Sequence, residues 1–333
     1  MWSATRVHLS KLKPLKLHPS TGVYLSPKLG QHLTINPGII DFMIESADLR
    51  SSDHVFEIGP GTGNITSRLL PLVRQVTAVE LDSRFFEEVR TRFSGAQNFT
   101  AIHGDALMSS WPKFDVLVCN PPYNISSALI FRLAQANFRQ AVVLLQREFA
   151  DRLTADPGEK NFSRLSINAR LDLRFEKIKQ VSAGSFYPTS SGASTLLKIT
   201  PRFPKPNVDF REWDAFIRLV FRERKRCLHA VLSKPYVCNM LEHNYKEFCR
   251  VNQIVVDCKA FPDLLLEVLE ERGLDRVAAM KLKVETLARL LEAFHNKNIF
   301  FSKVVASAQS PPAHAVRGSF DAGIPEFFFY DEK

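Results

Sequence analysis

The sequence has no apolar run of the roughly 18 residues that a membrane-spanning helix needs, and no early apolar stretch typical of a secretory signal. We therefore expect no membrane association. Its cysteines are isolated, without a Cys-x-x-Cys pair, and stand at Cys119, Cys227, Cys238, Cys249 and Cys258. This spacing argues against a zinc site and against a disulfide framework, so we expect reduced thiols and no bound metal.

Acidic residues are absent from the first 40 positions, which carry the cations Arg6, Lys11, Lys13, Lys16 and Lys28. A basic, acid-poor segment is typical of a mitochondrial transit peptide, although such peptides favour Arg and an amphipathic helix, which Pro14 and Pro19 interrupt here. The same composition is typical of an arm that lies along RNA phosphates. We delimit this basic N-terminal arm as residues 1–27 and leave both interpretations open.

The whole chain carries 44 Lys and Arg against 35 Asp and Glu, a net charge of +9. That balance favours a polyanionic partner, but many basic proteins bind none. The length of 333 residues and the hydrophobic content of 45% predict a globular protein with a large core.

Short runs rich in Val and Ile alternate with helical apolar stripes in the first half of the chain. The runs predict strands at 54–58, 75–79, 100–102, 115–119 and 141–145, with helices at 39–49, 65–73 and 85–93. Two further strands are predicted at 164–181 and 194–200. Because such alternation builds a parallel sheet covered on both faces, we predict a doubly wound α/β domain.

Three prolines mark a linker after this domain: Pro201, Pro204 and Pro206. Beyond them, apolar stripes predict helices at 210–221, 261–270 and 278–294. The predicted organisation is a sheet domain at 28–200, a smaller C-terminal α-helical domain at 207–302, and a tail at 303–333 in which periodicity fades.

A glycine-rich turn follows the first predicted strand, with the sequence Gly-Pro-Gly-Thr-Gly at 59–63. Glycines let the backbone approach a ligand closely, although any tight turn between strand and helix also uses them. Glu80 ends the second strand, where a carboxylate accepts bonds from ribose hydroxyls, and Asp105 follows the third strand, where it can bind an adenine amino group. Since the carboxyl ends of parallel strands share one edge, these features predict one crevice for an adenosine-bearing cofactor.

The sequence Asn120-Pro121-Pro122-Tyr123 directly follows the fourth predicted strand. The N6 amine of adenine is a poor nucleophile because its lone pair is delocalised into the ring. Asn120 Oδ1 and the Pro121 carbonyl can each accept an N6 hydrogen bond, which favours a pyramidal nitrogen with an available lone pair. Tyr123 can stack on an adenine turned out of its RNA. The pattern predicts methyl transfer to an adenine amine.

Together these motifs resemble the KsgA family of rRNA adenine dimethyltransferases, and they are most similar to the eukaryotic dimethyladenosine transferases of the small ribosomal subunit. The matching stretches lie in order between residues 30 and 200, with weaker similarity to about 302: Gly30 to His32, Phe56 to Asn64, Ala78 to Asp82, Gly104 to Ala106, Asn120 to Ser127, Leu145 to Ala150 and Arg164 to Asn168.

The resemblance implies a seven-stranded Rossmann-like methyltransferase domain that uses S-adenosylmethionine, and a helical domain that helps to hold RNA. The implied function is N6,N6-dimethylation of adenines in small-subunit rRNA during ribosome biogenesis. The expected partner is that rRNA or a pre-ribosomal particle, and we expect the enzyme to be a monomer.

The resemblance also implies site residues. Cofactor contacts are expected at His32, Thr34, Gly59, Glu80, Asp105 and Asn120, with Gly61 of the glycine-rich turn as a further predicted contact. The target adenine is expected between Tyr123 and Phe186. Three positions depart from the family: Pro121 replaces Leu or Ile, residues 189–194 replace a proline-rich element after Phe186, and Thr34 replaces Leu, so its contact is expected through the backbone.

A basic segment of the helical domain also resembles the family: Arg222, Arg224, Lys225 and Arg226. We predict that it contacts RNA phosphates and that binding weakens steeply with salt, with a merely solvated charged face as the alternative.

Three rival functions share parts of this pattern. A DNA adenine-N6 methyltransferase needs a target-recognition insertion, which is missing from the sequence. A mitochondrial ribosome-assembly or transcription factor of the same fold would be expected to lose motif residues, whereas Glu80, Asp105, Asn120 and Tyr123 are all present. An NAD-dependent oxidoreductase leaves Asn-Pro-Pro-Tyr unexplained. We expect a location in the nucleus or nucleolus, with the mitochondrion as the alternative.

Overall fold

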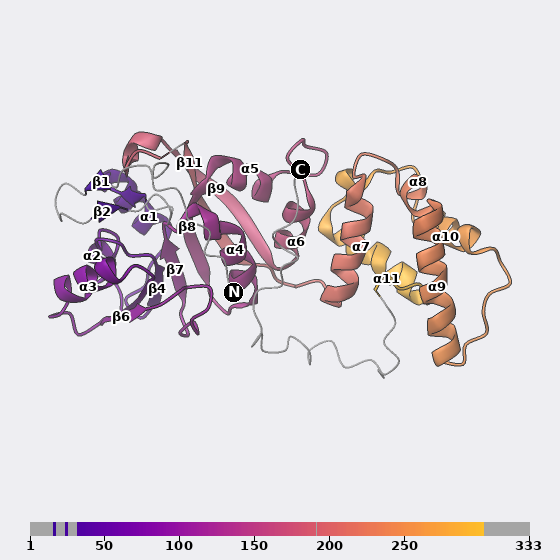
Figure 1. The fold of residues 1–333 in the computed structure, drawn as a ribbon, viewed down its shortest axis with the longest axis horizontal. Coiled ribbons are helices and arrows are strands. Elements are labelled where there is room, and N and C mark those ends of the chain that lie inside the picture. Colours follow the sequence, from indigo (N-terminus) through magenta and orange to yellow (C-terminus); the bar gives the residue numbers. More distant parts are fainter. Residues whose placement is uncertain (1–15, 18–23, 26–31, 191, 303–333) are drawn as a thin grey trace, which may run out of the picture. The chain divides into compact units, whose positions relative to one another are not determined.

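The computed structural model describes residues 16–17, 24–25, 32–190 and 192–302 (Figure 1). Most of the predicted arm and the predicted tail at 303–333 lie outside this description. The chain divides into two compact units, the first containing the described residues up to 150 and 176–200, the second 151–175 and 201–302. This division differs from the predicted continuous sheet domain at 28–200, because residues 151–175 belong to the second, helical unit.

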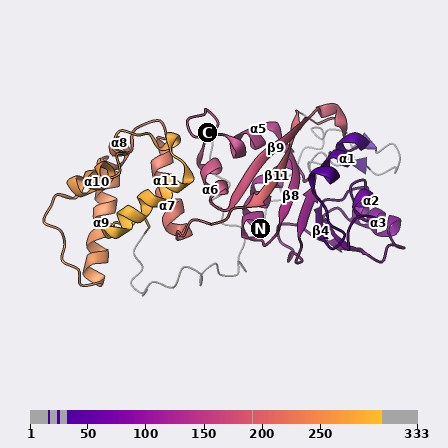
Figure 2. The ribbon, with the colours of Figure 1, turned by 180° about the vertical axis from the view of Figure 1, so that it is seen from behind.

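The first unit is built on a seven-stranded sheet with the order β6-β5-β4-β7-β8-β11-β9. Its strands are β4 (His54–Ile58), β5 (Gln75–Glu80), β6 (Phe99–His103), β7 (Val116–Cys119), β8 (Gln140–Gln146), β9 (Leu173–Val181) and β11 (Ser194–Pro201). The first five in spatial order are parallel, and β11 runs antiparallel to β8. Seen from behind, β8, β11 and β9 are again neighbours (Figure 2).

Both faces of the sheet are covered by apolar side chains. On one face, Met43 of α1 (Pro37–Ser46) and Leu69 of α2 (Thr66–Leu69) form a buried cluster with Val55 and other alternate strand residues. On the other, Phe56 meets Trp111 and Phe114, with ring centroids 5.4 Å apart in each pair. Val and Ile recur along these strands because both faces exclude water. The predicted doubly wound α/β fold is confirmed.

Further elements frame the carboxyl edge of the sheet. They are α3 (Ser83–Arg92), the 3₁₀ turn η3 (Tyr123–Ile125) and α4 (Ser126–Gln135). A separate two-stranded ladder pairs β3 (Leu33–Thr34) with β10 (Phe186–Tyr187), and another pairs β1 (Lys16–Leu17) with β2 (Tyr24–Leu25). The ladder of β3 and β10 brings the chain before α1 beside the chain before β11, although more than 150 residues separate them in sequence.

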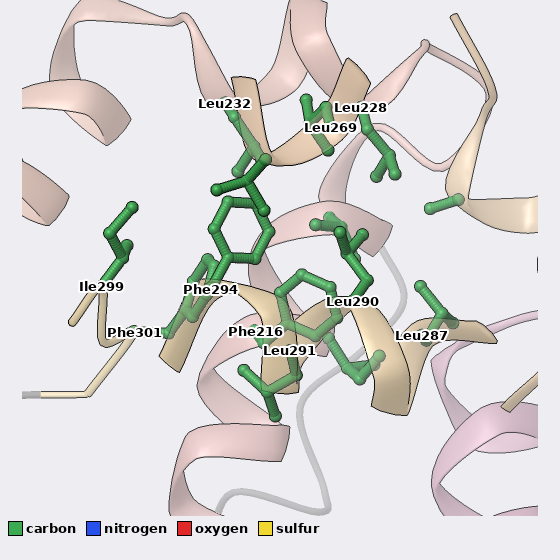
Figure 3. Close-up of a cluster of buried hydrophobic side chains, with 14 of the residues drawn as sticks. Phe216, Leu228, Leu232, Leu269, Leu287, Leu290, Leu291, Phe294, Ile299 and Phe301 are labelled. Atoms are coloured by element: carbon green, nitrogen blue, oxygen red, sulfur yellow. The ribbon is translucent and has the colours of Figure 1, made fainter. Parts of the chain in front are cut away.

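The helices of the second unit bury their apolar stripes against one another, and three of them, at 210–222, 261–270 and 284–296, correspond to predicted helices. They are α6 (Arg164–Asp172), α7 (Phe210–Arg222), α8 (Leu228–Leu232), α9 (Pro235–Val251), α10 (Phe261–Glu270) and α11 (Val284–Asn296), while α5 (Arg147–Thr154) crosses the boundary between the units. Figure 3 shows the centre of their core, where Phe216, Phe294 and Phe301 lie together. The rings of Phe216 and Phe301 meet edge to face at 4.8 Å, a favourable aromatic geometry.

Two predicted elements are wrong in part. Residues 164–172, predicted as the start of a long strand, form α6, and only 173–181 form a strand. The helix begins where Ser166 Oγ accepts a hydrogen bond from Ser163 N, which satisfies a free amide of the first turn. Residues 278–283, predicted as helical, contain only a short 3₁₀ turn before α11.

No helix in the described part of the chain is both long and apolar enough to cross a membrane. Nor do its His, Cys, Asp and Glu side chains form a group of three or more that could hold a metal ion.

Candidate active site

The chain changes direction across the sheet between β4 and β7. From β4 it continues to β5 and β6 on one side, and from β7 it continues to β8 on the other. Ile58 and Cys119, the last residues of β4 and β7, are paired, so the segments after both strands leave the sheet at one level. Ligands of open parallel sheets bind at the carboxyl ends of strands at such a switch point.

A pocket lies at this switch point. It is lined by residues of the β3 segment, the glycine-rich turn, the end of β5, α3 and the turn after β7: His32, Leu33, Thr34, Gly59, Pro60, Gly61, Thr62, Asn64, Ile65, Glu80, Phe85, Asn120, Pro121, Pro122 and Tyr123. Six of the seven predicted cofactor residues and three of the four predicted catalytic residues therefore meet in one cavity.

The glycine-rich turn forms the floor of the pocket. Gly59, Gly61 and Gly63 have φ angles of 69°, 56° and 79°, a backbone region that side chains rarely adopt. A Cβ at Gly61 would also meet Leu33 Cδ2, and a Cβ at Gly63 would stand 2.5 Å from the ring of Phe93. Glycine is therefore required here both by conformation and by space, and the turn leaves the floor of the pocket open to a ligand.

Glu80 holds this turn in place from the neighbouring strand. Its Oε2 accepts a hydrogen bond of 3.1 Å from Gly61 N, and its Oε1 accepts one of 3.0 Å from Asp82 N. Burial raises the pKa of this carboxyl, and the backbone donors partly oppose that effect. Each carboxylate oxygen keeps a further lone pair with which it can accept a bond from a ligand hydroxyl.

Asn120 has its side-chain amide fixed by the protein. Its Nδ2 donates a 2.7 Å hydrogen bond to the backbone carbonyl oxygen of His32. The imidazole of His32 is itself held, because its Nδ1 donates a 2.9 Å hydrogen bond to the carbonyl oxygen of Pro188. Because the amide nitrogen is held by the protein, Oδ1 is presented as an acceptor on the other side. Pro121, which follows directly, is buried and lines the same pocket.

Tyr123 is held at both ends of its side chain. Its hydroxyl is hydrogen-bonded to Ser194 Oγ at 2.7 Å, and its ring stacks on the imidazole of His32 with centroids 5.7 Å apart and planes 27° apart. These contacts fix the orientation of a half-buried aromatic ring beside the Asn120 amide. A positioned ring next to a positioned acceptor is what recognition of a planar base requires.

Two hydroxyls in the pocket wall lack partners. Thr34 and Thr62 are only 4% and 2% exposed, and neither Oγ1 has a hydrogen-bond partner among the described residues. The backbone of Thr34 is already engaged, since its carbonyl accepts a 3.2 Å bond from Asn64 Nδ2. A buried polar atom without a partner is costly, so such atoms in a pocket wall indicate a polar ligand. The open glycine floor, the strand-end carboxylate and these hydroxyls fit an adenosine-bearing cofactor.

Comparison with known proteins identifies the family. The sequence matches the ribosomal RNA adenine dimethylase family over residues 24–268, which is well over half of the chain. The chain belongs to this family. The match confirms the resemblance inferred from the motifs, and with it the enzyme class, a methyltransferase.

Curated relatives of this dimethylase cover most of its length. A probable dimethyladenosine transferase of Drosophila melanogaster is 36% identical over 303 residues, covering 88% of this chain and 99% of the relative. A dimethyladenosine transferase of Saccharomyces cerevisiae is 35% identical over 304 residues, covering 88% and 96%. The crystal structure of a dimethyladenosine transferase from Plasmodium falciparum is 40% identical, covers 81% of this chain and 100% of that one, and superposes with a TM-score of 0.77. The 23S rRNA methyltransferase ErmE, at 23% identity and a TM-score of 0.58, supports the fold.

Two predicted residues of the dimethylase are placed outside the pocket. Asp105 is half-buried, and its Oδ1 accepts a 2.7 Å bond from Leu107 N, which caps the turn after β6. Phe186 is 2% exposed and packs in the apolar cluster beneath α1. In this conformation its ring cannot sandwich an adenine, so the placement does not agree with the predicted role. The sequence Phe-x-Pro is compatible with a ring buried in the core and with a ring that stacks on a bound base. The pairing of β10 with β3 directs the ring of Phe186 into the core.

The predicted RNA-binding segment of the dimethylase is only partly available to RNA. Arg222, Lys225 and Arg226 are exposed. Arg224 is half-buried instead, and its guanidinium donates to the carbonyl oxygens of Phe162 and Lys160 within the helical unit. These bonds hold the Arg224 side chain within its own unit, so its contact with RNA stays a prediction.

Sequence reasoning missed several pocket residues. Leu33, Ile65 and Phe85 line the pocket without belonging to any motif that was singled out, and Asn64 ends the stretch 56–64 but was not predicted as a site residue. Leu81, directly after Glu80, remains 54% exposed at the carboxyl end of β5.

Proposed function

We propose that this protein transfers methyl groups from S-adenosylmethionine to the N6 atoms of adenines in small-subunit rRNA, making N6,N6-dimethyladenosine during ribosome biogenesis. The observation that carries the proposal is the orientation of the Asn120 amide. Its Nδ2 is bonded to the protein, so Oδ1 is free to accept a bond from a ligand, and the ring of Tyr123 beside it is held through its hydroxyl. Membership of the family supports both the methyl-transfer chemistry and the rRNA substrate.

When bound, S-adenosylmethionine supplies an electrophilic methyl group on a positively charged sulfur. Gly59 and Gly61 would let its carboxyl end approach the backbone closely, and Glu80 would accept bonds from its ribose hydroxyls. The hydroxyls of Thr34 and Thr62 would meet polar atoms of the same molecule.

The protein acts on the adenine through Asn120, Pro121 and Tyr123. Asn120 Oδ1 and the Pro121 carbonyl oxygen each accept a hydrogen bond from one of the two N6–H groups. This geometry favours a pyramidal nitrogen whose lone pair is less conjugated with the ring. Tyr123 stacks on the base and holds its plane, so the N6 atom is presented in one orientation. Each transfer would form an N6–carbon bond as the sulfur–methyl bond breaks, leaving S-adenosylhomocysteine, and N6 would lose one proton to solvent. The single remaining N6 hydrogen would then bond to one of the two acceptors, and a second S-adenosylmethionine would supply the second methyl group.

The cellular setting belongs to the same proposal. We place the enzyme in the nucleus or nucleolus, acting as a monomer on a pre-ribosomal particle; the basic, acid-free composition of residues 1–40 suits an arm that lies along RNA phosphates. A tagged full-length protein that accumulates in mitochondria would contradict this placement.

The test is methyl transfer to small-subunit particles that lack the modification. Purified protein is mixed with S-adenosylmethionine carrying a labelled methyl group, and the digested RNA is analysed for labelled nucleosides. Wild type should give N6,N6-dimethyladenosine, and Asn120→Ala should lose at least about 100-fold in rate, because one positioned acceptor is removed.

The control is Asn239→Ala, an exposed asparagine on α9. It should act like wild type. If the wild-type protein labels no adenine, or if Asn120→Ala is as active as Asn239→Ala, the proposed function is wrong.

A further inference from the structure

An exposed aromatic ring lies beside a cation on the surface of the helical unit. Tyr236 stands in the first turn of α9 and is 55% exposed. Arg222, the last residue of α7, places its guanidinium carbon 5.6 Å from the centre of the Tyr236 ring, a cation–π contact. The contact limits the motion of both side chains while leaving much of the ring open to solvent.

The surroundings of Tyr236 are strongly basic. Residues 222–234 contain five Lys and Arg and a single carboxylate, Glu223. That carboxylate is shared between Lys234 and Arg226, which lies 3.0 Å away. Arg222 also lies within the field of Glu223, but the five cations outnumber this one carboxylate, so the exposed Arg222 and Lys225 belong to a surface with an excess of positive charge.

The combination of an open aromatic face with uncompensated cations selects the partner chemistry. Cations alone would attract any polyanion, and an aromatic ring alone would suit many apolar partners. Single-stranded nucleic acid satisfies both, because its bases stack on aromatic rings while its phosphates pair with Lys and Arg. An acidic protein segment would use the charges but leave the ring without a planar partner.

We infer that Tyr236 is a stacking platform for an unpaired nucleotide of the RNA substrate, with Arg222 and Lys225 neutralising the adjacent phosphates. This inference rests on the proposed function, since it assumes that the substrate is RNA, and it assigns a contact in the helical unit that is separate from the pocket of the first unit. Stacking tolerates any base, so the platform adds affinity rather than sequence preference.

The test measures stacking directly. A short single-stranded RNA with 2-aminopurine at one position is titrated with the full-length protein, because stacking quenches the emission of this base. The position of the probe is moved along the oligonucleotide in separate samples. Wild type should quench at least one position, and Tyr236→Leu should abolish that quenching and weaken binding by roughly 5-fold or more. Tyr236→Trp should retain both.

The matched control is Phe203→Leu, since Phe203 is an aromatic residue of the same unit that is 71% exposed and has no place in the proposed platform. It should bind and quench as wild type does. Arg222→Gln should weaken binding and lower its dependence on salt, because one phosphate contact fewer releases one counterion fewer.

The inference is overturned if Tyr236→Leu quenches and binds like wild type, or if polyglutamate displaces the RNA as efficiently as an unlabelled RNA of equal charge. Its failure is distinguishable from failure of the proposed function. Wild type that methylates particles but shows no stacking on Tyr236 would remove the platform alone. Affinity for S-adenosylmethionine should be unchanged in every variant of this series.

Discussion

Thr34 is the residue at which the structure adds most to the sequence. The family resemblance leads to the expectation of a backbone contact, but the backbone carbonyl already accepts a bond from Asn64, while the buried Oγ1 has no partner within the described structure. The side-chain hydroxyl is therefore a group that a ligand can bond to, in addition to the second lone pair of the carbonyl oxygen. The same argument applies to Thr62, whose carbonyl oxygen accepts a bond from Arg92 and whose Oγ1 has no partner among the described residues.

Replacement of Thr34 by Val tests this assignment, because it removes the hydroxyl and keeps the shape. Free protein should become no less stable, since an unsatisfied buried hydroxyl is lost, whereas affinity for S-adenosylmethionine should fall about 5-fold, or about 1 kcal/mol. Thermal unfolding without ligand and calorimetric titration measure the two effects. Equal affinities of Thr34→Val and wild type would remove Thr34 Oγ1 from the binding site.

At this scale the sequence predicted the residues whose roles are set by local geometry. The glycine-rich turn, Glu80 and the Asn120 motif each follow a strand directly, so the end of the strand determines their position. The surroundings of Phe186 and Arg224 could not be predicted, for a physical reason. An aromatic ring or a guanidinium serves equally well in a core or at a surface, and only distant partners such as β3 or Phe162 decide between these environments.

Among the elements, β4 and α2 are joined by a buried carboxyl. Glu57 is 1% exposed, and its Oε2 accepts a 2.6 Å bond from Thr66 Oγ1 at the start of α2. Burial raises the pKa of Glu57 to about 8, an effect that the bond from Thr66 partly opposes. The folded protein therefore keeps this proton at pH values at which the unfolded chain has already lost it.

A pH dependence of stability follows. From pH 4.5, the ordinary pKa, to about 8, the unfolded chain binds fewer protons than the folded one, so this group makes unfolding easier as pH rises. The slope is at most about 1.4 kcal/mol per pH unit. In Glu57→Gln the free energy of unfolding should fall less steeply between pH 4.5 and 8 than in wild type. The exposed control Glu45→Gln should keep the wild-type slope. Denaturant unfolding at several pH values measures the difference, and parallel curves for wild type and Glu57→Gln would contradict the prediction.

The same scale contains the main error in the predicted secondary structure. Residues 164–172 carry Leu165, Ile167 and Leu171 at spacings that are compatible with a strand or with a short helix. The helix forms because Ser163 and Ser166 cap its first turn and because Asn168 accepts a 3.1 Å bond from the buried Trp213 indole. Trp213 lies 45 residues away, so no local pattern could have revealed this contact.

The molecule as a whole combines a methyltransferase sheet with a helical unit. Their order along the chain was predictable, since alternating strands and helices give way to helical stripes after a proline-rich linker. The interleaving was not predictable, because residues 151–175 belong to the helical unit, and Phe162 and Ile167 pack in its core, although residues 173–175 already begin β9. The comparisons extend over both units, so the family assignment covers the whole arrangement and not the sheet alone.

The most direct test of the central claim is a crystal structure of the protein with a non-reactive analogue of S-adenosylmethionine and adenosine. We predict that the analogue binds on the turn at 59–63, with Asn120 Oδ1 and the Pro121 carbonyl oxygen each roughly 3 Å from the adenosine N6 atom. Tyr123 should stack on the base. An adenosine bound elsewhere, or an Asn120 amide with Oδ1 directed away from N6, would contradict the account.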